Sequence, residues 1–144
     1  TCASAQKKAS EYSPDSTKTS SLLFGIQWDL VCKYLEVSVN WPTPSSGKTN
    51  VYYINEDSSS WGRYGGSSNT PSAGLERNKK MNIYDFAGNL WEWTLEHATI
   101  NSDSPCSSRG GYCSSTGSHY PASYRDFPSI VNIYAGVSFR ATFY

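Results

Sequence analysis

Apolar residues at the start of the chain recur at helical spacing. Cys2, Ala5, Ala9 and Tyr12 stand three or four residues apart, as the buried face of an α-helix requires. Thr1 precedes them and can cap the helix, because a threonine hydroxyl accepts a hydrogen bond from a first-turn amide. The pattern predicts a first helix over residues 2–12.

A second and stronger helical pattern follows the break at residues 13–16, which read Ser-Pro-Asp-Ser. Ser20 or Ser21 can cap this helix. One apolar stripe runs along it, formed by Leu23, Ile26, Leu30, Tyr34 and Leu35. We expect a helix over residues 22–36 whose stripe faces the core.

The rest of the chain predicts short strands separated by turns. Strand-forming segments occupy residues 51–54, 81–86, 90–94 and 137–143, with turn-forming residues between them. Residues 58–74, rich in Gly, Ser, Asn and Pro, are too polar to pack by themselves, and a loop of this length is more often functional or mobile than structural. Two helices followed by several short strands make an α+β fold.

Charge and composition exclude several classes of protein. Lys and Arg balance Asp and Glu at 12 each, so no basic stripe can neutralise a phosphate backbone and we expect no nucleic-acid partner. The apolar stretches fall far short of the about 20 residues that span a bilayer, which argues against membrane insertion. Four Cys without a CxxC pair, and two His, exclude the usual structural zinc patterns. The 144 residues predict one domain, and richness in Ser, Tyr and Trp with 17% charged residues suits a recognition surface.

The most distinctive segment is residues 82–94, Asn-Ile-Tyr-Asp-Phe-Ala-Gly-Asn-Leu-Trp-Glu-Trp-Thr. Gly88 and Asn89 supply a tight turn, Trp91 and Trp93 lie on one face of a strand as packing residues, and Glu92 points the opposite way. The segment closely resembles the YD-x-AGN-x-WEW motif of the formylglycine-generating-enzyme, or sulfatase-modifying-factor, domain family. Residues 109–111, 122–125 and 138–140 are similar to its RGG, A-x-R and GFR segments in the same order, with Ser in place of Gly at position 138.

The resemblance implies a C-type-lectin-like fold of the formylglycine-generating-enzyme type, with two helices packed on short antiparallel strands and long loops. It implies one such domain over residues 1–144, as the C-terminal part of a longer protein, with the last strand paired near the start of the domain. The resemblance also implies that the helix at residues 22–36 lies beside the sheet.

The residues argue against the catalytic activities of that family. Its oxidases need two cysteines five residues apart after the RGG strand, and this chain offers only Cys113, with Ser115 and Tyr120 where the pair would fall. Sulfoxide synthases of the same fold use three His, and this chain has two. We expect a protein that is not an enzyme; a catalytically altered oxidase or sulfoxide synthase is the alternative.

The last 38 residues, 107–144, draw on a restricted set of amino acids. They contain no Lys, Glu, Gln, Trp or Met, whereas residues 1–106 contain 21 of these. Randomising the adenines of an AAC or AAT codon cannot produce any of the missing types. Residues 107–144 therefore resemble the variable region of a diversity-generating retroelement, in which an error-prone reverse transcriptase rewrites the end of a gene for a C-type-lectin-like domain.

That resemblance divides the tail into fixed landmarks and candidates for variation. The landmarks are Arg109, Gly110, Gly111, Tyr124, Arg125, Phe139 and Arg140. The candidates, which we expect to bind the ligand, are Tyr112, Ser115, Ser118, His119, Tyr120, Asp126, Phe127, Ser129, Ile130, Val131, Ile133, Tyr134 and Ala135. The apolar residues between 127 and 135 follow no clean period, so they are either an irregular piece of core or an exposed contact patch.

Together these observations favour a non-enzymatic domain that binds a ligand or receptor through a hypervariable surface. The resemblance implies a protein or glycan receptor on a cell surface, display in multiple copies, and a place on a phage virion tail or an extracellular or cell surface. An invariant carbohydrate-binding module is the other alternative. No cofactor is expected, apart from the calcium considered next.

A few residues keep two interpretations. Cys113 is either one outcome of randomisation or a disulfide partner of Cys106, whereas Cys32 is a small buried hydrophobe. His119 is more often a solvated contact residue than a metal ligand. By resemblance to calcium-binding members of the enzyme family, a structural calcium ion would take as ligands Asp85, Gly88, Leu90 and Glu92. The simpler account is that Glu92 bonds backbone amides in a turn.

Overall fold

The structure is a computed structural model that describes residues 1–12, 15–36, 57–68, 75–97 and 106–144. Helix α1 spans Cys2–Glu11, and the Thr1 hydroxyl accepts a hydrogen bond from the Ser4 amide at its start. Cys2, Ala5 and Ala9 face the core, so the first predicted helix and its cap are confirmed. Tyr12 ends the helix as its C-cap and is 66% exposed, so the apolar face stops one turn earlier than the sequence pattern.

The second helix, α2, spans Gly25–Glu36 and begins three residues later than predicted. Strand β1, Ser20–Leu22, occupies the predicted cap and first turn, because its backbone pairs with the last strand of the chain. The Ser20 hydroxyl donates to the Ala9 carbonyl in the last turn of α1 at 2.6 Å and does not cap α2.

The predicted core-facing stripe of α2 is wrong in its centre. Ile26, Leu30 and Tyr34 are exposed, and the buried residues of the helix are instead Gly25, Trp28, Cys32 and Leu35. Trp28 decides this orientation, since its ring stacks on Phe86 with centroids 4.2 Å apart and its indole nitrogen donates to the Ala122 carbonyl at 2.8 Å. A tryptophan buries more apolar area than any residue of the exposed stripe.

The strands are short and form four small sheets. The largest has the order β8-β7-β6-β9, and the others pair β1 with β10, β2 with β5, and β3 with β4. The remaining elements are β2 (Gly62–Arg63), the 3-10 turn η1 (Glu76–Asn78), β3 (Lys79–Lys80), β4 (Ile83–Tyr84), β5 (Ala87–Gly88), β6 (Trp91–Thr94), β7 (Ser107–Arg109), β8 (Arg125–Asp126), β9 (Val137–Phe139) and β10 (Ala141–Phe143). Two helices with several short strands agree with the predicted α+β class. The expected antiparallel pairing is only partly right, because β2 with β5 and β6 with β9 pair in parallel.

Three of the predicted strands can be compared with the structure. The prediction over 90–94 is confirmed as β6, and that over 137–143 is divided into β9 and β10 at Arg140. The segment 81–86 is wrong as a single strand, because Met81 and Asn82 adopt positive φ angles and turn the chain between β3 and β4. The predicted strand at 51–54 lies outside the described residues. Part of the predicted loop at 58–74 is the short strand β2.

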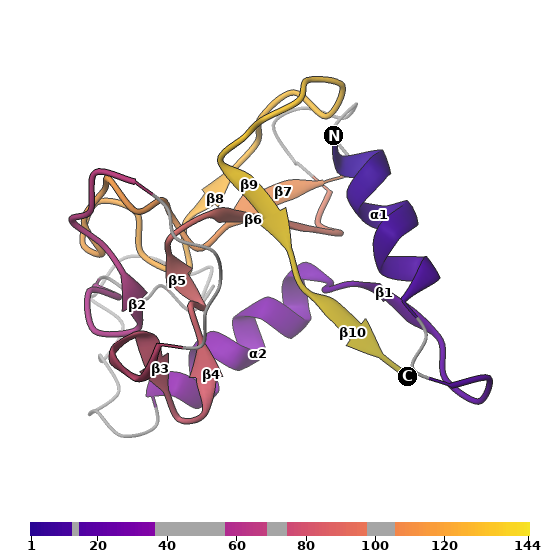
Figure 1. Ribbon diagram of the computed structural model, residues 1–144, viewed down its shortest axis with the longest axis horizontal. Helices are drawn as coiled ribbons and strands as arrows, with labels where there is room; N and C mark the ends of the chain where they lie inside the picture. The colour runs from indigo at the N-terminus through magenta and orange to yellow at the C-terminus, as the bar shows by residue number, and fades with distance from the viewer. Residues whose placement is uncertain (13–14, 37–56, 69–74, 98–105) are drawn as a thin grey trace, which may run out of the picture.

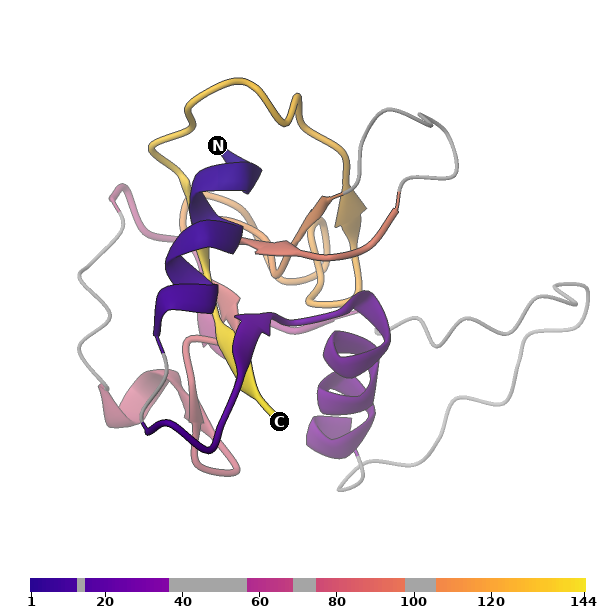
Figure 2. The same ribbon diagram turned by 90° about the vertical axis from the view of Figure 1, so that its right-hand side faces the viewer.

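The two helices cover opposite sides of the four-stranded sheet, and the ends of the chain meet. In Figure 1, α1 runs beside β9, β1 and β10, whereas α2 lies apart from α1. Figure 2 shows the same separation of the two helices. Strand β10 pairs antiparallel with β1, which agrees with the expected pairing of the last strand near the start of the domain. None of the helices within the described residues has the length and apolar character needed to cross a bilayer.

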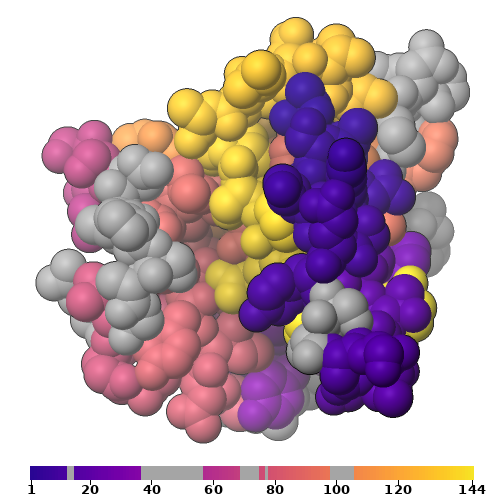
Figure 3. Space-filling view, turned by 45° about the vertical axis from the view of Figure 1, so that its right-hand side comes forward, coloured from indigo at the N-terminus to yellow at the C-terminus, as the bar shows by residue number. Residues whose placement is uncertain are grey.

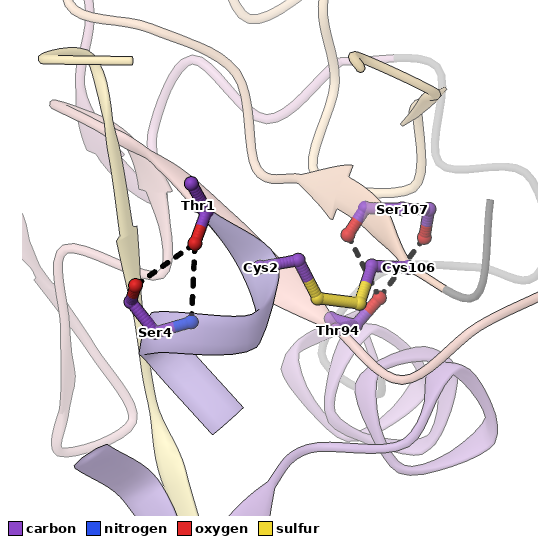
Figure 4. Close-up of a disulfide and its surroundings, with 6 residues drawn as sticks. All are labelled: Thr1, Cys2, Ser4, Thr94, Cys106 and Ser107. Carbon is purple, nitrogen blue, oxygen red and sulfur yellow. Dashed lines mark hydrogen bonds between the residues drawn. A yellow bond between two sulfur atoms is a disulfide. The ribbon is translucent and has the colours of Figure 1, made fainter. Parts of the chain in front are cut away.

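A disulfide joins Cys2, at the first turn of α1, to Cys106, just before β7 (Figure 4). The alternative of a Cys106–Cys113 bridge is therefore wrong: Cys113 is a free and fully buried thiol. Cys32 is also free and buried, as expected of a small hydrophobe, and burial raises the pKa of its thiol to about 12. Both free thiols are placed as packing residues.

Candidate binding face

The candidate site is built on the central strand, β6, whose side chains alternate between the two faces of the sheet. Trp91 and Trp93 point to the α1 side and Glu92 to the other, as the sequence predicted. Trp93 is buried in the core cluster that it shares with Cys2 and Ala5 of α1. Trp91 is half-buried and extends the same face beyond α1, where the aromatic residues of the tail meet it.

On the α2 side of the sheet, four charged residues form a closed network. Arg109 is fully buried, and its guanidinium contacts Asp29 at 2.5 Å and Glu96 at 2.6 Å. Arg125 contacts the other oxygen of each carboxylate, both at 2.5 Å. Burial acts to raise the pKa of Glu96, but the charges of Arg109 and Arg125 together outweigh it and hold that pKa below its usual value.

This network holds the two landmark arginines in place on the α2 side of the sheet. Arg109 belongs to β7, Arg125 to β8, Asp29 to α2, and Glu96 follows β6, so one cluster joins the sheet to the helix. The sequence analysis placed the two arginines as landmarks but missed Asp29 and Glu96. Asp29 lies 80 residues from Arg109 in the chain, and no local pattern links them.

Two glycines after Arg109 turn the chain from the sheet into the predicted variable region. Gly110 and Gly111 have φ angles of 93° and 82°, which favour glycine. A Cβ atom on Gly111 would lie 2.6 Å from the Tyr120 carbonyl oxygen, so the two backbones approach too closely for a side chain. The Tyr64 hydroxyl lies 2.9 Å from both the Gly110 and the Tyr120 carbonyl oxygens and bridges the two segments. Tyr64 was missed by the sequence analysis.

None of the thirteen candidates for variation is buried. The exposed ones are Ser118, His119, Asp126, Ser129, Val131, Ile133 and Ala135, and the half-buried ones are Tyr112, Ser115, Tyr120, Phe127, Ile130 and Tyr134. By contrast, the landmarks Arg109, Gly110 and Gly111 are all buried. The other four landmarks are not buried: Tyr124 and Phe139 are exposed, and Arg125 and Arg140 are half-buried. The tail therefore separates into a buried part and an exposed part, whose yellow, C-terminal portion lies beside α1 in Figure 3.

Aromatic rings form the centre of this exposed part. Tyr120 contacts Tyr124 edge to face with centroids 5.0 Å apart, and Trp91 contacts Tyr120 at 5.3 Å and Tyr124 at 6.0 Å. The His119 ring lies 4.4 Å from Tyr120. Edge-to-face contacts of this kind stabilise ring pairs beyond their buried area. Trp91 thus supports the tail tyrosines from a strand that lies outside the predicted variable region.

The segment between Phe127 and Ala135 is in part an irregular piece of core and in part an exposed apolar patch. Val131 and Ile133 are 76% and 88% exposed. Ile130 and Tyr134 pack instead against the core cluster around Trp93, and the rings of Tyr134 and Trp93 are 6.4 Å apart. One pair of apolar residues anchors the segment and the other pair faces solvent.

Two of the four residues considered for calcium, Asp85 and Glu92, contact Arg140. Glu92 is buried, and its Oε2 atom lies 2.7 Å from Nε of Arg140, whose Nη2 donates to the carbonyls of Tyr84 and Asp85 at 2.8 and 2.6 Å. Burial raises the pKa of Glu92, against the opposing charge of Arg140. Within the described residues no three or more His, Cys, Asp or Glu side chains come together as metal ligands would. The guanidinium thus supplies a positive charge beside Glu92, and calcium binding at these four residues stays a prediction. The simpler account, in which Glu92 bonds backbone amides, also misses this arginine.

Comparison with known proteins adds one likeness. A scan against protein-family models and a search of curated proteins both found no match. Among solved structures, Treponema denticola variable protein 1 matches 86% of this chain with a TM-score of 0.57 and 18% sequence identity. This chain spans 47% of that chain, about half of its length. At such an identity the likeness concerns the fold: the chain has a mixed α and β fold like that of a variable protein. This comparison does not test the formylglycine-generating-enzyme type of fold, which stays a prediction.

Proposed function

We propose that this domain binds ligands through a diversified surface formed by the exposed part of residues 107–144. The observation that carries the proposal is the separation within the tail: every candidate for variation reaches solvent, while the Arg-Gly-Gly landmark is buried. The likeness to a variable protein and the restricted amino-acid set of the tail support the same conclusion. The proposed role is binding without catalysis.

Physical reasons favour such an arrangement for a surface that must change. Substitutions at exposed positions away from packing and capping contacts usually alter stability by less than about 0.5 kcal/mol. The buried frame beneath is tied by Arg109 to the helix and to the sheet, so its geometry does not depend on the exposed side chains. A rigid frame also lowers the entropy lost when a ligand binds.

The chemistry of the exposed part suits a protein or glycan receptor. Tyr120, Tyr124 and Trp91 offer aromatic surface, which contributes much of the contact energy in binding sites, and Val131 and Ile133 add apolar area. We propose that the receptor lies on a cell surface and that the domain is displayed in several copies on a virion tail or a cell surface, because repeated weak contacts then bind tightly.

The DNA around the gene provides the first test. We expect a reverse-transcriptase gene and a second, imperfect copy of the stretch that encodes residues 107–144, with mismatches confined to template adenines. The mismatches should fall at the exposed codons and spare buried ones such as those of Gly111, Cys113 and Ala122, because changes there would disturb packing. Absence of the copy, or mismatches spread evenly over buried codons, would remove the basis for diversification.

Binding is tested by a display experiment with two matched libraries. One library randomises the thirteen candidate codons, and the control library randomises codons for the exposed α2 residues Ile26, Leu30 and Tyr34. Selection against several purified bacterial surface proteins and glycan-coated beads should yield binders from the tail library, with melting temperatures within a few degrees of the parent. Equal yields from the two libraries, or general loss of folding in the first, would contradict the proposal.

A further inference from the structure

A polar pocket lies beside β2, in the segment that the sequence analysis described only as a long polar loop. Its volume is 380 Å³, and it is lined by Ser59, Gly62, Arg63, Tyr64, Gly66 and Asn78. Sites for small molecules commonly have volumes of about 300–1,000 Å³. The lining residues all precede residue 107, so the pocket walls are not part of the predicted variable region.

Two hydrogen-bond donors of the lining residues have no acceptor. Nε of Arg63 and Nδ2 of Asn78 are both buried, and neither has a partner within the described residues. The Asn78 residue is 4% exposed, so its side-chain donor is shielded from bulk solvent. Buried polar groups are paired in nearly all native proteins, and an unpaired one at a pocket wall calls for a ligand or an ordered water.

The charge of the lining residues favours an anionic acceptor. Arg63 is the one charged residue among those described as lining the pocket, and its guanidinium carries a positive charge. Its Nη2 atom donates to the Ser68 carbonyl at 3.1 Å, which holds the guanidinium in place. Its Nε atom has no partner among the described residues. A carboxylate offers two acceptor oxygens and forms strong hydrogen bonds with a guanidinium.

Gly66 leaves space beside the guanidinium. A Cβ atom on Gly66 would lie 3.1 Å from Nη2 and 3.2 Å from Nε of Arg63 and would fill that space. The amides of Gly65 and Gly66 donate to the carbonyls of Ser115 and Cys113 at 3.0 and 2.8 Å. Because these contacts involve only backbone atoms of the tail, the pocket keeps its frame when tail side chains change.

We propose that this pocket binds a carboxylate group, with Arg63 and Asn78 as its donors. The carboxylate belongs either to an acidic sugar or to the C-terminus of a peptide, and the same two donors would receive both. The site is separate from the diversified surface and does not depend on the proposed function. If both exist, every variant would share one constant contact for an acidic group beside a changing surface.

The test uses nitrogen-15 NMR, because Nε–H of Arg63 and the Asn78 side-chain amide give observable signals. The labelled protein is titrated with sodium N-acetylneuraminate and, separately, with a tetrapeptide that has a free C-terminus; its amidated form and sodium chloride at equal ionic strength are controls. We expect saturable shifts of both signals with at least one carboxylate ligand and none with the controls. Which ligand binds identifies the source of the carboxylate.

Two variants and one control complete the experiment. Arg63→Gln should weaken binding at least about tenfold, as loss of a charge-assisted hydrogen bond does. Lys7→Gln removes one positive charge from the exposed side of α1 and should leave the affinity unchanged. Gly66→Ala, which fills the space beside the guanidinium and keeps the charge, should also weaken binding and serves if the Arg63 variant fails to fold. No saturable shift at tens of millimolar ligand, or full affinity in a folded Gly66→Ala protein, would overturn the proposal.

Discussion

Replacing Arg109 with methionine should lower the free energy of unfolding by about 3–5 kcal/mol, since breaking a buried ion pair leaves its partners without compensation. Arg109 is fully buried and contacts both Asp29 and Glu96. In its absence, the two carboxylates face each other with only Arg125 between them. Methionine fills much of the volume, so the loss reports mainly on charge. Urea denaturation at neutral pH measures it.

A matched control separates the buried charge from packing. Adding Asp29→Asn and Glu96→Gln to the Arg109→Met variant removes the uncompensated charges and should restore part of the lost stability. Arg125→Met should cost less than Arg109→Met, because Arg125 is partly exposed and water can solvate the carboxylates in its place. A loss below about 1 kcal/mol for Arg109→Met would mean that the network adds little to the frame.

Removal of the Cys2–Cys106 disulfide should have a similarly large effect. The bond joins residues separated by 104 positions, and closing a loop of this length stabilises a folded domain by about 4–5 kcal/mol through the entropy of the unfolded chain. The double variant Cys2→Ala, Cys106→Ala should therefore melt at a markedly lower temperature than the parent. Calorimetry with and without a reducing agent measures the difference.

The reducing agent provides the internal control for this prediction. It should lower the melting temperature of the parent toward that of the double variant and leave the variant itself unchanged, because Cys32 and Cys113 are free thiols. Cys2 and Cys106 both belong to the core cluster around Trp93, so α1 should be the first element to detach. A parent protein that is insensitive to reduction would contradict a stabilising role for the bond.

These two features explain how a changing surface can rest on this small domain. The disulfide fixes α1 against one face of the sheet, and the Arg109 network fixes α2 against the other. Neither uses any of the thirteen residues predicted to vary. Stability is therefore supplied by groups that are separate from the proposed contact surface, as a surface that changes its ligand would require.

Local patterns were sufficient for several elements of the fold. The Thr1 cap and the spacing of Cys2, Ala5 and Ala9 predicted α1, since capping and helical periodicity act within a few residues. The alternation of Trp91, Glu92 and Trp93 predicted β6 for the same reason. The amino-acid set of residues 107–144 pointed to positions that the structure places at the surface.

Only the tertiary structure decided which segments meet. Ser20 and Ser21 looked like helix caps, yet they form a strand because β10 pairs with them. Ile26 and Leu30 had the period of a core-facing stripe, but Trp28, on another side of α2, packs on Phe86 and donates a hydrogen bond to Ala122. Arg109 contacts Asp29, 80 residues away in the sequence, and Cys2 bonds to Cys106, 104 residues away. Contacts between residues so distant in the sequence form only when the whole chain folds. Their free energy depends on packing and on the entropy of bringing distant segments together, so no local sequence pattern records them.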